Sequence, residues 1–173
     1  MTFLRRFLVA AIGALSLVGA GAVSAGADEG GTVITFGSMT PITAPALRNH
    51  VNDRGLTGGG VPWKITTGSG TVDRDGHVSV RVTGLVLVAT GKNPIGTFAA
   101  VVSCRTTAQQ IVNKQTGGVP ASSTGDATIN TTVDLPHPCT TPEVFVGGLI
   151  KISATVTVFR WFAVSNGDFE DAG

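Results

Sequence analysis

The stretch that decides the fold is residues 71–88, which read TVDRDGHVSVRVTGLVLV. Within it, Asp75-Gly76 supplies the positive φ angle that tight β-turns need, so a hairpin turn is expected at 73–76. Residues 77–83 then carry valine at every second position with polar side chains between, which is the period of a strand with one buried face. After a glycine, residues 85–88 are all apolar and predict a strand buried on both faces.

Similar strand patterns recur on both sides of this hairpin, and helical patterns are scarce. Strands are expected at 32–36, 63–67, 71–72, 97–104, 109–113, 127–135, 143–146 and 150–164, with the glycine-rich residues 68–70 as a break. Loops are expected at 38–60, with space for one short helix near 44–51, and at 117–126. Eight to ten strands at this spacing favour an all-β fold, an antiparallel β-sandwich of jelly-roll-like or immunoglobulin-like topology. A small β-barrel is the alternative.

The first 27 residues have the pattern of a cleaved export signal. An arginine pair precedes an apolar run, and small residues then lead to Ala25 and Ala27, after either of which cleavage is expected. An uncleaved anchor helix over 7–27 is the alternative, because that run is long enough to cross a bilayer. The prediction is a signal peptide over 1–27 and a single secreted β-sandwich domain over 28–173, with no membrane association after cleavage.

The charge of the chain argues against two classes of partner. Its formal charge of +1 falls to −1 once Arg5 and Arg6 leave with the signal, and charged residues make up only 13% of the sequence. No basic surface for nucleic acid or for an anionic membrane is therefore expected.

The aromatic residues give a weak case for sugar binding. Tyrosine is absent and tryptophan occurs twice. Trp161 with Phe162 beside Arg160, and Lys64 beside Trp63, leave open a small patch for a sugar or a partner. Strand alternation nevertheless places Trp161 and Phe162 on opposite faces, so one of them is expected in the core.

The two cysteines, Cys104 and Cys139, are expected to form one structural disulfide, as pairs in exported domains usually do. The bridge would close a loop of about 36 residues and staple the two stacked layers together. A catalytic thiol or a metal-binding pair is the alternative.

No catalytic, cofactor-binding or metal-binding set is expected from the sequence. Asp73-Arg74-Asp75-Gly76 could begin a calcium loop, but residues 76–82 add no further acid, and a plain hairpin turn explains the segment. The three histidines are His50, His77 and His137, and none has the spacing of a local metal pair. The two histidine–carboxylate pairings available to a hydrolase are His50 with Asp53 and His77 with Asp75. No Gly-x-Ser-x-Gly motif supplies a nucleophile for either.

Several segments resemble a group of small exported proteins from high-GC Gram-positive bacteria. They are VPWKI at 61–65, GLVL at 84–87, Asn93-Pro94 leading to VSC at 102–104, LPHPC at 135–139 and WFAV at 161–164. That group has no assigned activity. The resemblance therefore implies a secreted all-β domain with one disulfide, and it carries over no functional residue.

Three functions remain open from the sequence. The first is a secreted, non-enzymatic protein that binds an extracellular or cell-wall ligand through the loops at 38–60 and 117–126. The second is an extracellular hydrolase that uses one of the two histidine–carboxylate pairings. The third is a structural surface protein whose exposed strand edges pair with copies of itself. The identity of the ligand and the oligomeric state are not readable from the sequence.

Overall fold

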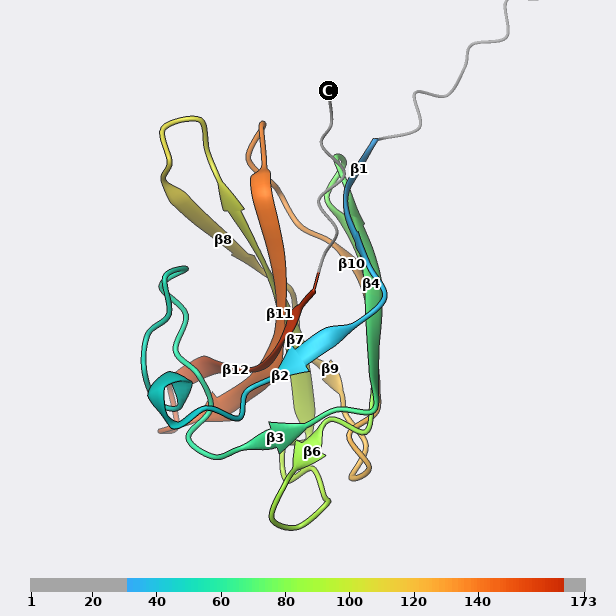
Figure 1. The fold of residues 1–173 in the computed structure, drawn as a ribbon, viewed down its shortest axis with the longest axis vertical. Helices are drawn as coiled ribbons and strands as arrows, with labels where there is room; N and C mark the ends of the chain where they lie inside the picture. The colour runs from blue at the N-terminus through green and yellow to red at the C-terminus, as the bar shows by residue number, and fades with distance from the viewer. Residues whose placement is uncertain (1–30, 167–173) are drawn as a thin grey trace, which may run out of the picture.

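Two antiparallel sheets face each other in the computed structural model, which describes residues 31–166 (Figure 1). The smaller sheet has the order β1 (Thr32–Phe36), β4 (Thr67–Asp73), β5 (His77–Thr83) and β10 (Ala127–Thr132). The larger has the order β2 (Met39–Pro41), β12 (Thr157–Ser165), β11 (Thr140–Lys151), β7 (Thr97–Arg105) and β8 (Ile111–Gln115), and β9 (Val119–Pro120) also pairs with β7. A short pair, β3 (Trp63–Lys64) and β6 (Val86–Leu87), and the 3-10 helix η1 (Pro45–Leu47) complete the described elements.

The architecture confirms the predicted all-β sandwich. Both sheets are open paths in the described part of the chain, so the alternative of a closed barrel is wrong. The expected signal peptide, 1–27, lies outside the described residues. Among the described residues, no helix has the length and apolar character that a membrane crossing requires.

The β4–β5 hairpin forms where the sequence predicts it. Gly76 has a φ of 81°, and its amide donates to the Asp73 carbonyl at 3.1 Å. The three valines of β5 are at most 1% exposed, which confirms the alternation. The predicted break at 68–70 is wrong, because β4 runs straight through it. A Cβ atom at Gly70 would lie 2.5 Å from the Ser79 carbonyl oxygen and 2.8 Å from the Phe36 ring, so that glycine makes room for the neighbouring strand and a core side chain.

An aromatic cluster fills one part of the space between the sheets. Trp63 stacks on Phe162 with ring centroids 3.9 Å apart, and Phe98 meets both rings edge-on. All three side chains are at most 2% exposed. Phe98 and Phe162 belong to the larger sheet and Trp63 to the β3–β6 pair, so the cluster holds that short pair against the larger sheet.

Other strand predictions also need correction. The strand expected at 143–146 is the longer β11, Thr140–Lys151. The segment 150–164 is not one strand: β11 ends at Lys151 and β12 starts at Thr157. The intervening turn is built on Ser153, whose hydroxyl accepts hydrogen bonds from two following backbone amides. The apolar run 85–88 forms only the two-residue strand β6, and Val88 at its end is 49% exposed.

The predicted disulfide between Cys104 and Cys139 is present, with 4.9 Å between the Cα atoms. Its place in the fold differs from the expectation. Cys104 lies near the end of β7 and Cys139 just before β11, and these strands are neighbours in the same sheet. The bridge therefore does not join the two layers. It fixes the point at which the chain arriving from β10 enters the larger sheet.

Candidate functional site

The connection between β2 and β3, residues 42–62, covers the outer face of the larger sheet; we call it the covering loop (Figure 1). Part of it pairs with the exposed edge of β12: the Gly59 amide donates to the Trp161 carbonyl at 2.9 Å, and the Trp161 amide donates to the Thr57 carbonyl. A Cβ atom at Gly58 would lie 2.3 Å from the Leu47 carbonyl oxygen. Glycine is therefore what lets the loop fold back on itself over the sheet.

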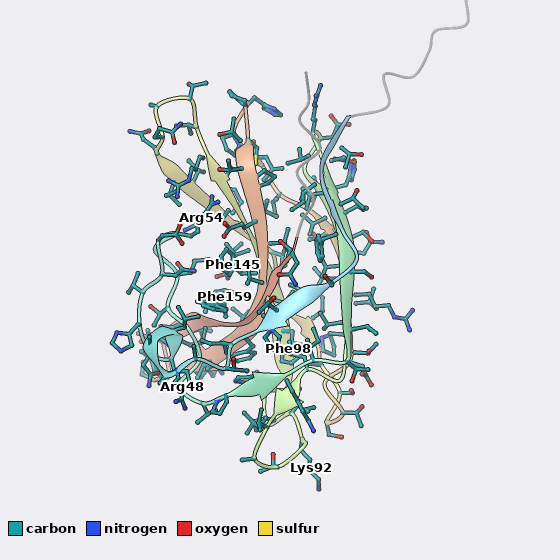
Figure 2. The ribbon with its side chains drawn as sticks, in the orientation of Figure 1. Arg48, Arg54, Lys92, Phe98, Phe145 and Phe159 are labelled. Carbon is teal, nitrogen blue, oxygen red and sulfur yellow. A yellow bond between two sulfur atoms is a disulfide. The ribbon has the colours of Figure 1, made fainter. Side chains whose placement is uncertain are left out.

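Arg54 anchors the covering loop and is itself only 3% exposed. Its Nη2 donates to Glu143 Oε1 at 2.7 Å and to the Thr141 carbonyl at 2.9 Å. Its own carbonyl accepts a hydrogen bond from Asn113 Nδ2 at 2.7 Å. These three partners lie on β8 and β11, the strands on either side of β7, so the sheet holds Arg54 at two places. In Figure 2, Arg54 and Phe145 lie between the covering loop and the strands.

A second charged contact lies beside this anchor. Asp53 Oδ2 accepts from Arg105 Nη2 at 3.2 Å and lies 3.9 Å from Arg54 Nε. Arg105 directly follows the disulfide-bonded Cys104 in β7. The covering loop is thus tied to the part of the sheet that the disulfide fixes.

A cleft of about 400 Å³ opens between the covering loop and the sheet. Its floor is apolar and includes Phe145, Trp161 and Val164. Phe145 and Trp161 meet edge to face, with centroids 5.6 Å apart. Asp53 and Glu143 stand at its side. Concave apolar floors with a few polar groups are the usual form of a small-molecule site.

The two carboxylates leave acceptor atoms free in this cleft. In each carboxylate one oxygen binds an arginine: Glu143 Oε1 binds Arg54, and Asp53 Oδ2 binds Arg105. The other oxygens, Glu143 Oε2 and Asp53 Oδ1, accept no hydrogen bond from the described residues. A carboxylate has room for about four hydrogen bonds. The cleft can therefore hold an apolar body against the ring edges while accepting hydrogen bonds from hydroxyl or amine groups of the same molecule.

The structure does not bring His50 and Asp53 together as a hydrogen-bonded pair. Asp53 is engaged by arginines, and His50 is exposed. His137 is also exposed, in the connection that leads to Cys139.

His77 pairs with a different aspartate from the one expected. Its Nδ1 lies 2.9 Å from Asp73 Oδ2, whereas the sequence had suggested Asp75. One ligand atom from each of these three residues lies within 4.8 Å of the others, so among the described residues this hairpin could hold a metal ion. In the described part of the chain His77 makes no side-chain hydrogen bond to a serine, threonine or cysteine, so the geometry supplies the base and its orienting acid without a nucleophile.

The candidate aromatic patch is not on the surface. Trp161 and Phe162 do point to opposite faces, as alternation predicts, but both are at most 3% exposed. Phe162 faces the other sheet and stacks on Trp63. Trp161 faces the covering loop, and its Nε1 donates to the Leu56 carbonyl at 3.3 Å. Of the two, only Trp161 lines the cleft, where a small part of its surface is available to a ligand.

Sequence reasoning placed a contact surface in the loop at 38–60 but missed the residues that make it a site. Arg54 and Phe145 carried no local signal, because their roles come from partners remote in the chain. Comparison with known proteins adds no outside constraint: no family model, no curated protein and no solved structure matches this chain.

Proposed function

We propose that this protein is exported and acts outside the cell by binding a ligand, and that the cleft under the covering loop is the binding site. Support for export comes from the signal-like first 27 residues and from the disulfide, which is typical of oxidising compartments. Support for binding comes from the cleft itself. The ligand it suits is small and amphipathic, with an apolar body and hydroxyl or amine donors.

The observation that carries this proposal is that the cleft is built on fixed walls. The Arg54 anchor and the pairing of the covering loop with β12 hold the loop side, and the disulfide-bonded region of the sheet holds the other. Binding to a preformed site avoids the entropic cost of ordering a loop.

Tryptophan fluorescence offers a direct test, because Trp161 is one of only two tryptophans in the chain and lies in the cleft floor. The purified full chain would be titrated with an array of extracellular glycans, cell-wall fragments and small amphipathic amines. A binder should change the emission, and the change should disappear in Trp161→Phe, whose remaining tryptophan lies between the sheets.

A matched pair of variants locates the site. Asp53→Ala should weaken binding about tenfold, because it removes a free acceptor beside the ligand. Asp134→Ala, at an exposed acid that pairs with Lys114, should leave it unchanged. If Asp53→Ala and the unmodified protein bind with equal affinity, the ligand binds elsewhere. If no compound of the array changes the fluorescence, the proposed ligand chemistry is refuted.

A hydrolase is the second candidate: the hydrogen-bonded Asp73–His77 pair supplies a base and its orienting acid, and water activated by His77 would serve as the nucleophile. An aspartate that orients a histidine is the arrangement used in acyl transfer. Turnover of ester or amide substrates that is lost in His77→Ala and kept in His50→Ala would support it. Activity that survives His77→Ala would exclude this pair.

A further inference from the structure

The outer face of the smaller sheet, on the side away from the cleft, is a regular array of polar side chains, most of which bear hydroxyl groups. Strand register aligns Thr35, Thr71, Ser79 and Asn130 in one row across all four strands. All four are exposed. Next to them on the same strands, Ile34, Val72, Val80 and Ile129 are buried. The side chains on the right of Figure 2 project from this sheet into solvent.

The next row contains an unpaired arginine. Register places Ser69, Arg81 and Thr128 side by side on β4, β5 and β10. Arg81 is exposed and forms no ion pair with any described residue. Neighbouring strands lie about 4.8 Å apart, and successive outward positions along a strand about 6.7 Å apart. The hydroxyl groups of Ser69 and Thr128 therefore flank Arg81, close enough for one ligand to contact all three side chains.

Two shallow depressions on this face share Arg81. One, of about 580 Å³, runs from Arg81 past Thr83 and Thr128 to the loop before β10. The other, of about 300 Å³, runs from Arg81 past Ser79 and Thr71 towards β1. Together the two depressions form a track with Arg81 at its middle, and this shape suits an extended chain better than a compact molecule.

The carboxylate at the end of the track belongs to Asp126 and is already engaged. It accepts hydrogen bonds from the Gly84 amide at 2.9 Å and from the Thr124 hydroxyl at 2.7 Å. At the opposite end the track reaches Thr35 on β1. Arg81 is the one cation in the two rows. Together with the Thr124 hydroxyl, its charge helps to lower the pKa of the Asp126 carboxyl, but its guanidinium donates no hydrogen bond to a described residue, so the donors remain available to a ligand.

The chemistry of this surface selects among partners. A protein interface would need aromatic or aliphatic anchors, and the outward positions of the two rows carry none. Nucleic acid would need a cation for nearly every phosphate contacted, and the track has one. A hydrated polymer with many hydroxyl groups matches the threonines and serines, and an occasional carboxylate on it matches the planar fork of an arginine.

We propose that the outer face of the smaller sheet binds an acidic polysaccharide, with a sugar carboxylate on Arg81 and sugar hydroxyls on the flanking threonine and serine side chains. This site is separate from the cleft under the covering loop and does not depend on a ligand there.

Affinity electrophoresis of the purified full chain in gels containing polygalacturonate tests this proposal. Migration should be retarded by polygalacturonate and not by its fully methyl-esterified form or by dextran, because these lack the carboxylate. Arg81→Gln should weaken the apparent affinity about tenfold or more. Arg74→Gln is the matched control, because Arg74 is an exposed arginine in the turn of the same hairpin and lies off the two rows.

Several outcomes would overturn the proposal: no retardation by polygalacturonate, equal retardation by the neutral polymers, or equal loss in the two arginine variants. Arg81 forms no ion pair with a described residue, and its charge acts only on the exposed Asp126, so Arg81→Gln should change the melting temperature little, and circular dichroism checks this. Retention of polymer binding in Asp53→Ala, which weakens the cleft, would show that this surface and the cleft act separately.

Discussion

The buried ion pair that anchors the covering loop allows a quantitative prediction. Glu143→Gln keeps the shape of the side chain but removes the charge that faces the Arg54 guanidinium. That guanidinium is 3% exposed, and its Nε and Nη1 already have no hydrogen-bond partner among the described residues. Breaking a buried pair from one side costs about 3–5 kcal/mol. Because Glu143 is 27% exposed and the Thr141 carbonyl still accepts from Arg54, we expect the low end, about 3 kcal/mol.

Urea denaturation followed by circular dichroism measures this loss as a lower midpoint with an unchanged slope. Asp134→Asn is the control, because it breaks an ion pair with Lys114 in which the aspartate is 97% exposed. Exposed pairs contribute below about 1 kcal/mol. Cleavage of the covering loop by a protease should also become faster in Glu143→Gln and not in Asp134→Asn. If the two variants lost the same stability, Arg54 would not be the anchor inferred here.

Three other changes test separate parts of the molecule. Replacing both Cys104 and Cys139 by alanine should lower the free energy of unfolding by about 3–4 kcal/mol in urea titrations, because the bridge spans a sequence separation of 35 residues. Gly58→Ala should cost about 2 kcal/mol in thermal unfolding, because its Cβ atom would overlap a backbone carbonyl, whereas Gly37→Ala, with nothing within 4 Å, should stay within about 0.5 kcal/mol. A threonine hydroxyl and then a backbone amide hold the pKa of Asp126 below its ordinary value. Its contribution to stability is therefore full above pH about 4 and is lost as the pH falls through the lowered pKa. In urea titrations at several pH values, Asp126→Asn should lose less stability between neutral and acidic pH than the unmodified protein does. An equal loss in both proteins would contradict this role of Asp126.

The predictable features of the fold were those that depend on residues close together in the sequence. The turn at Asp75-Gly76 follows from backbone conformation, and the burial of alternate residues in β5 follows from the period of a strand. Glycines were misleading as signs of strand ends. At Gly70 and at Gly147 the chain stays in a strand, and the missing side chain makes room for a neighbouring ring or backbone instead.

The candidate site was much less predictable, because its residues are joined by contacts across the whole chain. Arg54 meets Thr141 and Glu143, which are 87 and 89 residues away. No local pattern marks an arginine in a polar loop as one that will be buried. The pairing of His77 with Asp73 instead of Asp75 was missed because the β4–β5 turn directs its side chains in ways that spacing alone does not fix.

One signal in the sequence nevertheless distinguishes the two sheets, and it bears on where binding occurs. In β5 every second residue is polar, so the outer face of the smaller sheet can remain in water. In β7, by contrast, the seven residues between its two ends are all buried, which is possible only if something covers the outer face of the larger sheet. That cover is the covering loop, and the cleft exists because the loop must lie on an apolar face without filling it. In β7 an apolar pattern on both sides thus marks a covered face, whereas strict alternation in β5 marks a face that is open to water.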